Sequence, residues 1–147
     1  MPKIGADAAI NYHQQDFVAW QQDHLPSGFD VIVDVVGGDY LNKNLKVAAL
    51  DSRIVILSML GGRFSNAVDI AKCLLKRVNI HASTLRNRSN SYKAALINHF
   101  LNDFAEKLSM GELHPVIGDV FDWRDANRAH QVMESNQNIG KLILTVS

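Results

Sequence analysis

The sequence predicts an α/β fold with a parallel sheet, and two apolar, β-branched runs carry this prediction. They occupy residues 29–36 and 53–59, and each leads into a glycine pair. Continuous runs of this kind are typical of parallel strands that other elements cover on both faces. One short helical segment separates the two runs, and this strand, helix, strand order favours the α/β class. Because open α/β sheets bind ligands at the carboxyl ends of their strands, the glycine pairs mark the candidate site.

The first expected elements lie close to the amino terminus. Residues 3–7 are typical of a helix end with its glycine stop, and a short strand is expected at 8–12. A weakly amphipathic helix is expected at 16–24, and Pro26 ends it before the first apolar strand. A chain that begins at the end of a helix indicates a truncated protein, although a native amino-terminal stub would look the same.

The helix between the two apolar runs must cross over to reach the second strand. We expect Asp39 to cap this helix. Its apolar stripe consists of Leu41, Leu45, Ala48 and Ala49. Since crossovers between parallel strands are right-handed, strands at 8–12, 30–36 and 53–59 can share one sheet with helices on its faces.

The same alternation continues beyond the second glycine pair. The pattern predicts a helix at 66–76 and then a strand at 78–84. The residues of that helix expected to face inward are Val68, Ala71, Leu74 and Leu75. A long amphipathic helix is expected at about 91–110, where Gly111 stops it. The last expected elements are an extended segment at 114–121, a helix that begins near Asp122 and Asp125, and a strand at 141–146.

The overall composition is that of one globular domain with no general affinity for polyanions. The 147 residues include 15 acidic and 15 basic side chains, so the net charge is zero. A nucleic-acid or membrane-surface binder would need a clustered cationic excess, and the chain has none. No apolar run approaches the ~18 residues of a membrane span, and the cytoplasm is therefore the expected compartment.

The sequence offers no local metal site and no phosphate-binding turn. Cys73 is the single cysteine and stands in an apolar helical context, which favours a buried structural thiol. The six histidines, at 13, 24, 81, 99, 114 and 130, show no metal-ligand spacing. The nine glycines include no Gly-x-Gly, so the turn that cradles phosphates in dinucleotide-binding folds is missing.

Taken together, five segments in one order resemble the zinc-independent, NADPH-dependent quinone oxidoreductases of the medium-chain dehydrogenase/reductase superfamily. The segments are Gly-Ala-Asp-Ala-Ala-Ile-Asn-Tyr12, Asp-Val-Val-Gly-Gly38, Met-Leu-Gly-Gly62, Ser83-Thr-Leu-Arg-Asn-Arg88 and Asn138-Ile-Gly-Lys141. The likeness covers essentially the whole chain, which makes it far more specific than any one motif. Enoyl reductases and zinc alcohol dehydrogenases share this sheet, and the last two segments favour the quinone-reductase branch.

The resemblance implies that the chain is the carboxyl-terminal part of an enzyme about twice as long. Residues 1–88 would form an incomplete, Rossmann-like, doubly wound parallel sheet within a single domain that spans 1–147. Residues 89–147 would supply helices and a strand that return to a GroES-like barrel, which is absent. The first half of the nucleotide-binding domain, with its glycine-rich turn and its 2′-phosphate selector, is absent too. The chain would therefore carry half of an NADPH site, and NADH is not excluded.

The resemblance places several residues at the adenosine end of the cofactor. Tyr12 would lie there and could donate a phenolic hydrogen bond to phosphate or ribose. Val36, Gly37 and Gly38 would line the adenine-ribose side. Lys141 would reach a cofactor phosphate. The structural alternatives are an exposed tyrosine at a strand end, ordinary turn glycines and a solvated lysine.

At the nicotinamide end, the resemblance places residues that orient the ring. Met59, Leu60 and Gly61 would lie beside it, and Leu85 and Arg86 would flank the same end. Arg86 could equally be a solvated loop charge. In such an enzyme, hydride passes directly to a quinone or enone, so the protein supplies position and a dry pocket, and no catalytic side chain or metal is expected.

Two other functions remain open at this stage. The chain could be a non-catalytic short sheet module for dimerisation or interaction. In the family, homodimers form by antiparallel pairing of the strand equivalent to 78–84, and an exposed edge strand is a ready template for such pairing. An unrelated flavodoxin-like nucleotide binder would need an acidic cluster or a phosphate loop, neither of which the sequence contains.

Overall fold

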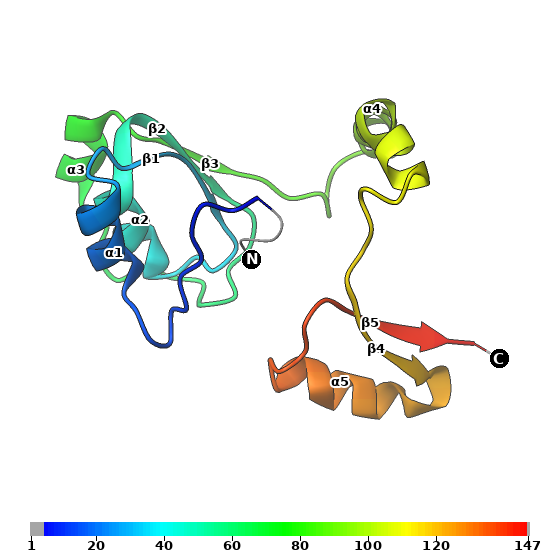
Figure 1. The fold of residues 1–147 in the computed structure, drawn as a ribbon. Helices are drawn as coiled ribbons and strands as arrows, with labels where there is room; N and C mark the ends of the chain where they lie inside the picture. The colour runs from blue at the N-terminus through cyan, green and yellow to red at the C-terminus, as the bar shows by residue number, and fades with distance from the viewer. Residues whose placement is uncertain (1–4, 147) are drawn as a thin grey trace. The chain divides into compact units, whose positions relative to one another are not determined.

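The computed structural model describes residues 5–146, which divide into two compact units (Figure 1). One unit extends to Asn87 and the other begins at Arg88. Of the expected helix end at 3–7, residues 3 and 4 lie outside the described part of the chain. Gly5 adopts a left-handed φ of 89°, as a glycine at a helix stop does. Whether the two units form one domain stays a prediction.

A three-stranded parallel sheet forms the centre of the first unit. Its strands, in spatial order, are β1 (Phe29–Asp34), β2 (Ala48–Ile56) and β3 (Asn79–Ala82). Ile32, Ile54 and Ile80 lie opposite one another across the three strands. Helices and parallel strands thus confirm the predicted α/β class.

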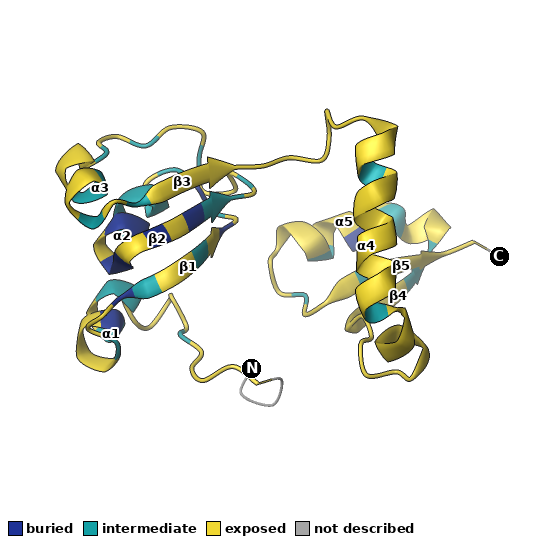
Figure 2. Cartoon of the chain, turned by 90° about the horizontal axis from the view of Figure 1, so that it is seen from above, coloured by how far each residue is buried: buried dark blue, intermediate teal, exposed yellow. Residues whose placement is uncertain are grey.

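Three helices lie on one face of this sheet (Figures 1 and 2). They are α1 (Phe17–His24), α2 (Tyr40–Val47) and α3 (Ile70–Lys76). The core lies between them and the sheet, where Leu45 and Ile54 are fully buried and Val47 is nearly so. On the opposite face, Val31 and Val33 are 57% and 61% exposed, so the first unit by itself covers its sheet on one side only.

The expected strand at 8–12 is wrong. Residues 8–11 have no regular structure, and a turn follows, in which Gln14 and Gln15 donate backbone hydrogen bonds to the Asn11 carbonyl. A strand needs a neighbour for its backbone groups, and none of the described residues pairs with this segment. Ile10 is its one large aliphatic side chain, which gives the segment little to bury.

The strand β2 begins five residues before the predicted start at 53. Ala48 and Ala49 belong to this strand and not to the helix, because Ala48 has extended backbone angles of −66° and 138°. Gly28 explains this junction. A Cβ on Gly28 would come within 2.7 Å of the Ala49 nitrogen, so the glycine lets the chain before β1 pack against the start of β2.

The expected bounds of four elements also shift. Both apolar strands end earlier than expected, at Asp34 and Ile56, and β3 is shorter than the predicted 78–84. The helix predicted at 66–76 begins at Ile70, where Asp69 accepts a hydrogen bond from the Lys72 backbone. Its expected inward-facing leucines, Leu74 and Leu75, are exposed, and Cys73 is half-buried.

The second unit contains a long helix and a two-stranded parallel sheet. Its elements are α4 (Asn90–Ser109), β4 (Ile117–Asp122), the 3-10 helix η2 (Trp123–Asp125), α5 (Ala126–Glu134) and β5 (Lys141–Thr145). β4 pairs with β5. Ser89 caps α4 by accepting a hydrogen bond from the Tyr92 backbone, and Gly111 adopts the left-handed φ of a helix stop. The predicted long helix is thereby confirmed.

Candidate cofactor site

Two loops lie side by side at the carboxyl edge of the sheet. We call residues 35–39, after β1, the first glycine loop, and residues 57–62, after β2, the second glycine loop. The Gly61 N–H donates to the Val36 carbonyl oxygen at 2.7 Å, and the Leu57 N–H donates to the Asp34 carbonyl oxygen at 2.8 Å. These bonds continue the strand pairing into the loops. The structure therefore brings the two glycine pairs, which the sequence marked as the candidate site, next to each other.

The glycines make this close approach possible. A Cβ on Gly61 would lie 2.7 Å from Val36 Cγ1, closer than two carbon atoms can approach without movement. A Cβ on Gly37 would lie 3.0 Å from the Ser58 carbonyl oxygen, and one on Gly38 would lie 3.1 Å from that of Gly61. Gly37 and Gly38 also adopt left-handed φ angles of 67° and 55°. Mutual packing of the loops therefore explains the glycines without a ligand.

A buried carboxylate, which the sequence analysis did not single out, shapes the first glycine loop. Asp34 Oδ1 accepts from the backbone N–H of Val36 at 2.7 Å and of Gly37 at 2.9 Å. Its Oδ2 accepts from Asn44 Nδ2 at 2.9 Å, and both side chains are buried. Asp34 thus ends β1 by turning its backbone and ties that turn to α2. The signal was an aspartate at the end of an apolar strand, directly before the turn.

The second glycine loop presents apolar side chains to solvent. Met59 and Leu60 are 64% and 81% exposed, although both belong to a loop that is hydrogen-bonded to its neighbour. A fixed loop with exposed apolar side chains can cover the face of a planar ring and keep water from it. This is the chemistry that the nicotinamide end of the predicted site requires.

Tyr12 lies at a different place, in a hollow beside the starts of α1 and α2. The hollow has a volume of about 260 Å³ and is lined by residues 12–17 together with Tyr40 and Lys43. The Lys43 ammonium lies 5.7 Å and 5.5 Å from the ring centroids of Phe17 and Tyr40, and 3.6 Å from the Asp16 carboxylate. The aromatic walls suit a planar ring, and an anionic group bound there would compete with Asp16 for the Lys43 ammonium. The sequence analysis missed Lys43.

The other predicted residues are less closely tied to the two loops. Arg86 lies in the turn after β3, where its backbone N–H donates to Thr84 Oγ1 at 3.3 Å, and Leu85 beside it is half-exposed. Among the described residues, no hydrogen bond links either of them to the glycine loops. Lys141 begins β5 in the second unit, where its backbone N–H donates to the Val116 carbonyl oxygen at 2.8 Å. The cofactor roles of all three stay predictions.

The parallel sheet with its helices defines an α/β protein, and comparison with known proteins identifies the family. Residues 4–144 match the family model described as zinc-binding dehydrogenase. The chain therefore belongs to the zinc-binding dehydrogenase family. The match falls on the carboxyl-terminal part of its relatives, as the sequence analysis predicted.

Individual relatives support this assignment. The chain is 29% identical over 144 residues to quinone oxidoreductase-like protein 2 of Rattus norvegicus, and the match covers 97% of the chain and 40% of the rat protein. Its fold matches an NAD-dependent alcohol dehydrogenase, with a TM-score of 0.74, 24% identity and coverage of 99% and 40%. It also matches CurA of Vibrio vulnificus in complex with NADPH, with a TM-score of 0.76, 18% identity and coverage of 97% and 44%. The chain spans about two fifths of the length of these proteins.

The descriptions of these proteins imply two bound groups, a zinc ion and a nicotinamide dinucleotide. The chain offers different residues to each of them. No three His, Cys, Asp or Glu side chains within residues 5–146 come together in a way that could hold a metal ion, so zinc finds no ligand set there. Toward a dinucleotide, the chain offers the exposed apolar side chains of Met59 and Leu60 and, at a different place, the aromatic hollow with Lys43 and Asp16. Across the described residues, no helix is long and apolar enough to cross a membrane.

Proposed function

We propose that this chain is the carboxyl-terminal part of an NAD(P)H-dependent quinone oxidoreductase. The observation that carries the proposal is the pairing of the two glycine loops at the carboxyl ends of β1 and β2. Ligands of open α/β sheets bind at this edge. The family match and the quinone oxidoreductase-like relative support the same activity.

In this proposal, the reduced nicotinamide supplies the hydride that reaches a quinone or enone. The chain's own residues bind and orient. Met59 and Leu60 cover one face of the ring and exclude water from it, and the Gly61 backbone fixes their loop against Val36. Tyr12 and Lys43 line the hollow that would hold the adenosine end, where the Lys43 ammonium would exchange its contact with Asp16 for a phosphate. Leu85 and Arg86 complete the contacts proposed for the first unit, and the contact of Lys141 with a cofactor phosphate stays a prediction from the resemblance.

The chain alone supplies half of this site, so we expect weak cofactor binding and no reductase activity. The experiment is a titration of the ¹⁵N-labelled chain with NADPH, followed by backbone amide shifts. We expect shifts at Gly37, Gly38 and Gly61 that do not saturate at low micromolar NADPH, with the Gly28 amide, at the other end of β1, as an internal control. Tight saturable binding would contradict the half-site. An absence of shifts at millimolar NADPH would overturn the proposed function.

The adenosine end can be tested separately. Replacing Lys43 with Gln removes the one cation of the hollow, and we expect it to weaken NADPH binding several-fold, by the energy of one exposed charge pair. Lys46→Gln, one turn further along the same helix, is the matched control. If Lys43→Gln weakens NADPH and NADH equally, Lys43 contacts a phosphate that both cofactors share. If only the affinity for NADPH falls, Lys43 contacts the 2′-phosphate.

A second function is favoured by the free edge of the sheet. β3 is an outer strand in the order β1-β2-β3, and in the proposed homodimer this strand pairs with its copy in a second chain. A module that only dimerises would use the same strand. Sedimentation equilibrium of a variant with Ile80→Pro tests this, because proline cannot donate to a strand pair. A dimer that persists in the variant would contradict pairing through β3, provided circular dichroism shows the fold intact.

A further inference from the structure

The start of α2 is bound to the segment that follows the second glycine loop. Asp39 Oδ1 accepts from the Asn66 backbone N–H at 2.9 Å, and Asp39 Oδ2 accepts from Asn66 Nδ2 at 3.0 Å. Asp39 occupies the N-cap position of α2, as expected, but its side chain makes no cap bond to that helix. Two parallel bonds to a residue 27 positions away fix both the distance and the orientation of that segment.

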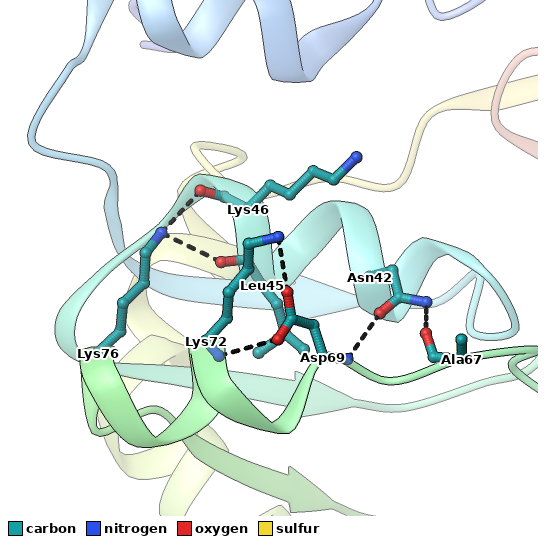
Figure 3. Close-up of polar contacts among 7 residues, drawn as sticks. All are labelled: Asn42, Leu45, Lys46, Ala67, Asp69, Lys72 and Lys76. Atoms are coloured by element: carbon teal, nitrogen blue, oxygen red, sulfur yellow. Dashed lines mark hydrogen bonds and ion pairs between the residues drawn. The ribbon is translucent and has the colours of Figure 1, made fainter.

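Asn42, one turn further along α2, binds the residues that follow Asn66 (Figure 3). Its Nδ2 donates to the Ala67 carbonyl oxygen, and its Oδ1 accepts from the Asp69 backbone N–H at 3.3 Å. Asp69 in turn caps α3, and the hydrogen bond from the Lys72 ammonium lowers the pKa of its carboxyl. The contacts of Asn42 thus pass directly into the first turn of α3.

A lysine from the last turn of α3 binds the other end of α2. The Lys76 ammonium donates to the carbonyl oxygens of Leu45 and Lys46 at 3.1 and 2.7 Å (Figure 3). It also donates to the Ala48 carbonyl oxygen at 2.7 Å. These carbonyls lie at the carboxyl end of α2, where a cation is favourable. Burial lowers the pKa of Lys76, and the charge of Lys72 lowers it further. α2 and α3 are therefore joined near both of their ends.

The second glycine loop is consequently held on two sides. Val36 binds it at Gly61, and Asp39 and Asn42 bind the chain five to eight residues beyond Gly61. Without the second attachment, the stretch from Gly62 to Asp69 would be tethered at one end by the loop and at the other by α3. Hydride transfer depends on placing a ring to within a fraction of an ångström, so a freely moving loop could not orient it.

We infer that Asp39 and Asn42 are positioning residues, which set the second glycine loop for the nicotinamide ring without touching it. This inference rests on the proposed function. Asp39 is the last residue of the first glycine loop and Asn42 lies on α2. Both act on the second glycine loop through residues 66–69, which follow it in the chain.

The test compares Asp39→Ala with the conservative variant Asp39→Asn by amide hydrogen exchange. Removing two hydrogen bonds should raise exchange across residues 59–66 roughly tenfold in Asp39→Ala. In Asp39→Asn the amide can still accept from the Asn66 N–H, and its own NH₂ can pair with the oxygen of a turned Asn66 amide, so it should restore protection. Asp51→Asn, which breaks an exposed ion pair elsewhere, is the matched control and should leave residues 59–66 unchanged.

NADPH-induced amide shifts supply the readout that a purely structural role would not give. In Asp39→Ala, shifts at Met59–Gly61 should disappear while those near Tyr12 persist, and Asp39→Asn should recover both. Wild-type shifts that Asp39→Ala leaves unchanged would overturn the positioning role alone. Absence of shifts in the wild-type chain would overturn the proposed function and the positioning role with it, while the exchange data would still show whether Asp39 holds the loop.

Discussion

The two compact units differ in how each is stabilised. In the first unit, Leu45 and Ile54 are fully buried, and the polar contacts of Asp34, Asp39 and Lys76 connect helices to loops. In the second unit, Ala129 is the one buried apolar side chain among the described residues, and no residue of α4 is buried. Hydrophobic burial dominates folding free energy, so the first unit carries most of the chain's own stability. The candidate loops belong to this stable unit.

Removing core volume from the first unit should cause the largest loss in the free energy of unfolding. Leu45→Ala should lower the free energy of unfolding by about 2–5 kcal/mol, through lost transfer energy and a residual cavity. Leu108→Ala, at a side chain of α4 that is 40% exposed, should cost less than about 1 kcal/mol. Urea titrations can separate the units, because Trp20 lies in α1 and Trp123 in η2.

Variants that retain one tryptophan assign each transition. With Trp123→Phe, Trp20 reports the first unit, and with Trp20→Phe, Trp123 reports the second. We expect Leu45→Ala to move the Trp20 transition and leave that of Trp123 in place. An equal shift of both transitions would show that the two units unfold together. It would contradict the conclusion that the first unit carries most of the stability.

The next effect concerns the first glycine loop. Asp34→Ala removes the acceptor of two backbone N–H groups and leaves the buried Asn44 amide without its partner. Unsatisfied buried donors should cost about 1–3 kcal/mol in the free energy of unfolding, measured from the Trp20 transition. Asn44→Ala removes one of the three bonds and is the milder reference. If both variants unfold at the same urea concentration, the bonds from Asp34 to the loop backbone contribute nothing to stability.

The attachment of α3 to α2 should contribute less, because it is partly exposed. Lys76→Met keeps the aliphatic stem and removes the ammonium from three carbonyl oxygens, which should cost about 1 kcal/mol. Lys46→Met is the control, since the backbone carbonyl of Lys46, and not its side chain, takes part in this contact. Urea midpoints that match for the two variants would contradict a stabilising role of the Lys76 ammonium.

The sequence predicted the elements of both units that depend on apolar runs. The positions of β1 and α2 in the first unit and of α4 in the second followed from the apolar run at 29–36 and from helical spacing. It failed at 8–12, where no described strand is available to pair, and at the start of α3. The bonds of Asp39 and Asn42 with residues 66–69 span 25–27 positions and leave no periodic signal, so only the folded chain reveals them.

The candidate site shows the same limit. The glycine pairs lie at the carboxyl edge of the sheet, as the sequence predicted. Glycines after a buried strand indicate a close approach of backbones. What they approach could not be predicted, and the structure shows that it is each other, at Val36 and Gly61. Lys43 was missed because it becomes part of the Tyr12 hollow only when α2 packs beside α1.

The smallest change in stability is expected when the exposed ion pair between Asp51 and Arg77 is broken. Arg77 Nε and Nη2 donate to the two carboxylate oxygens of Asp51, each at 2.6 Å, and both residues have left-handed φ angles. The pair joins the start of β2 to the turn before β3. The hydrogen bonds from Arg77 hold the pKa of Asp51 below its ordinary value of 3.8, and the pKa of Arg77 is raised by the same contact.

Since the pKa of Asp51 is lower in the folded chain than in the unfolded one, the pair stabilises the fold above pH 3.8, and this stabilisation is lost as the pH falls through the folded value. The difference in urea midpoint between the wild type and Asp51→Asn should therefore be constant near neutral pH and shrink below about pH 4. High salt should shrink it at every pH, because both side chains are exposed. A difference that grows on acidification would contradict the ion pair, and would mean that Asp51 acts through the left-handed turn geometry instead.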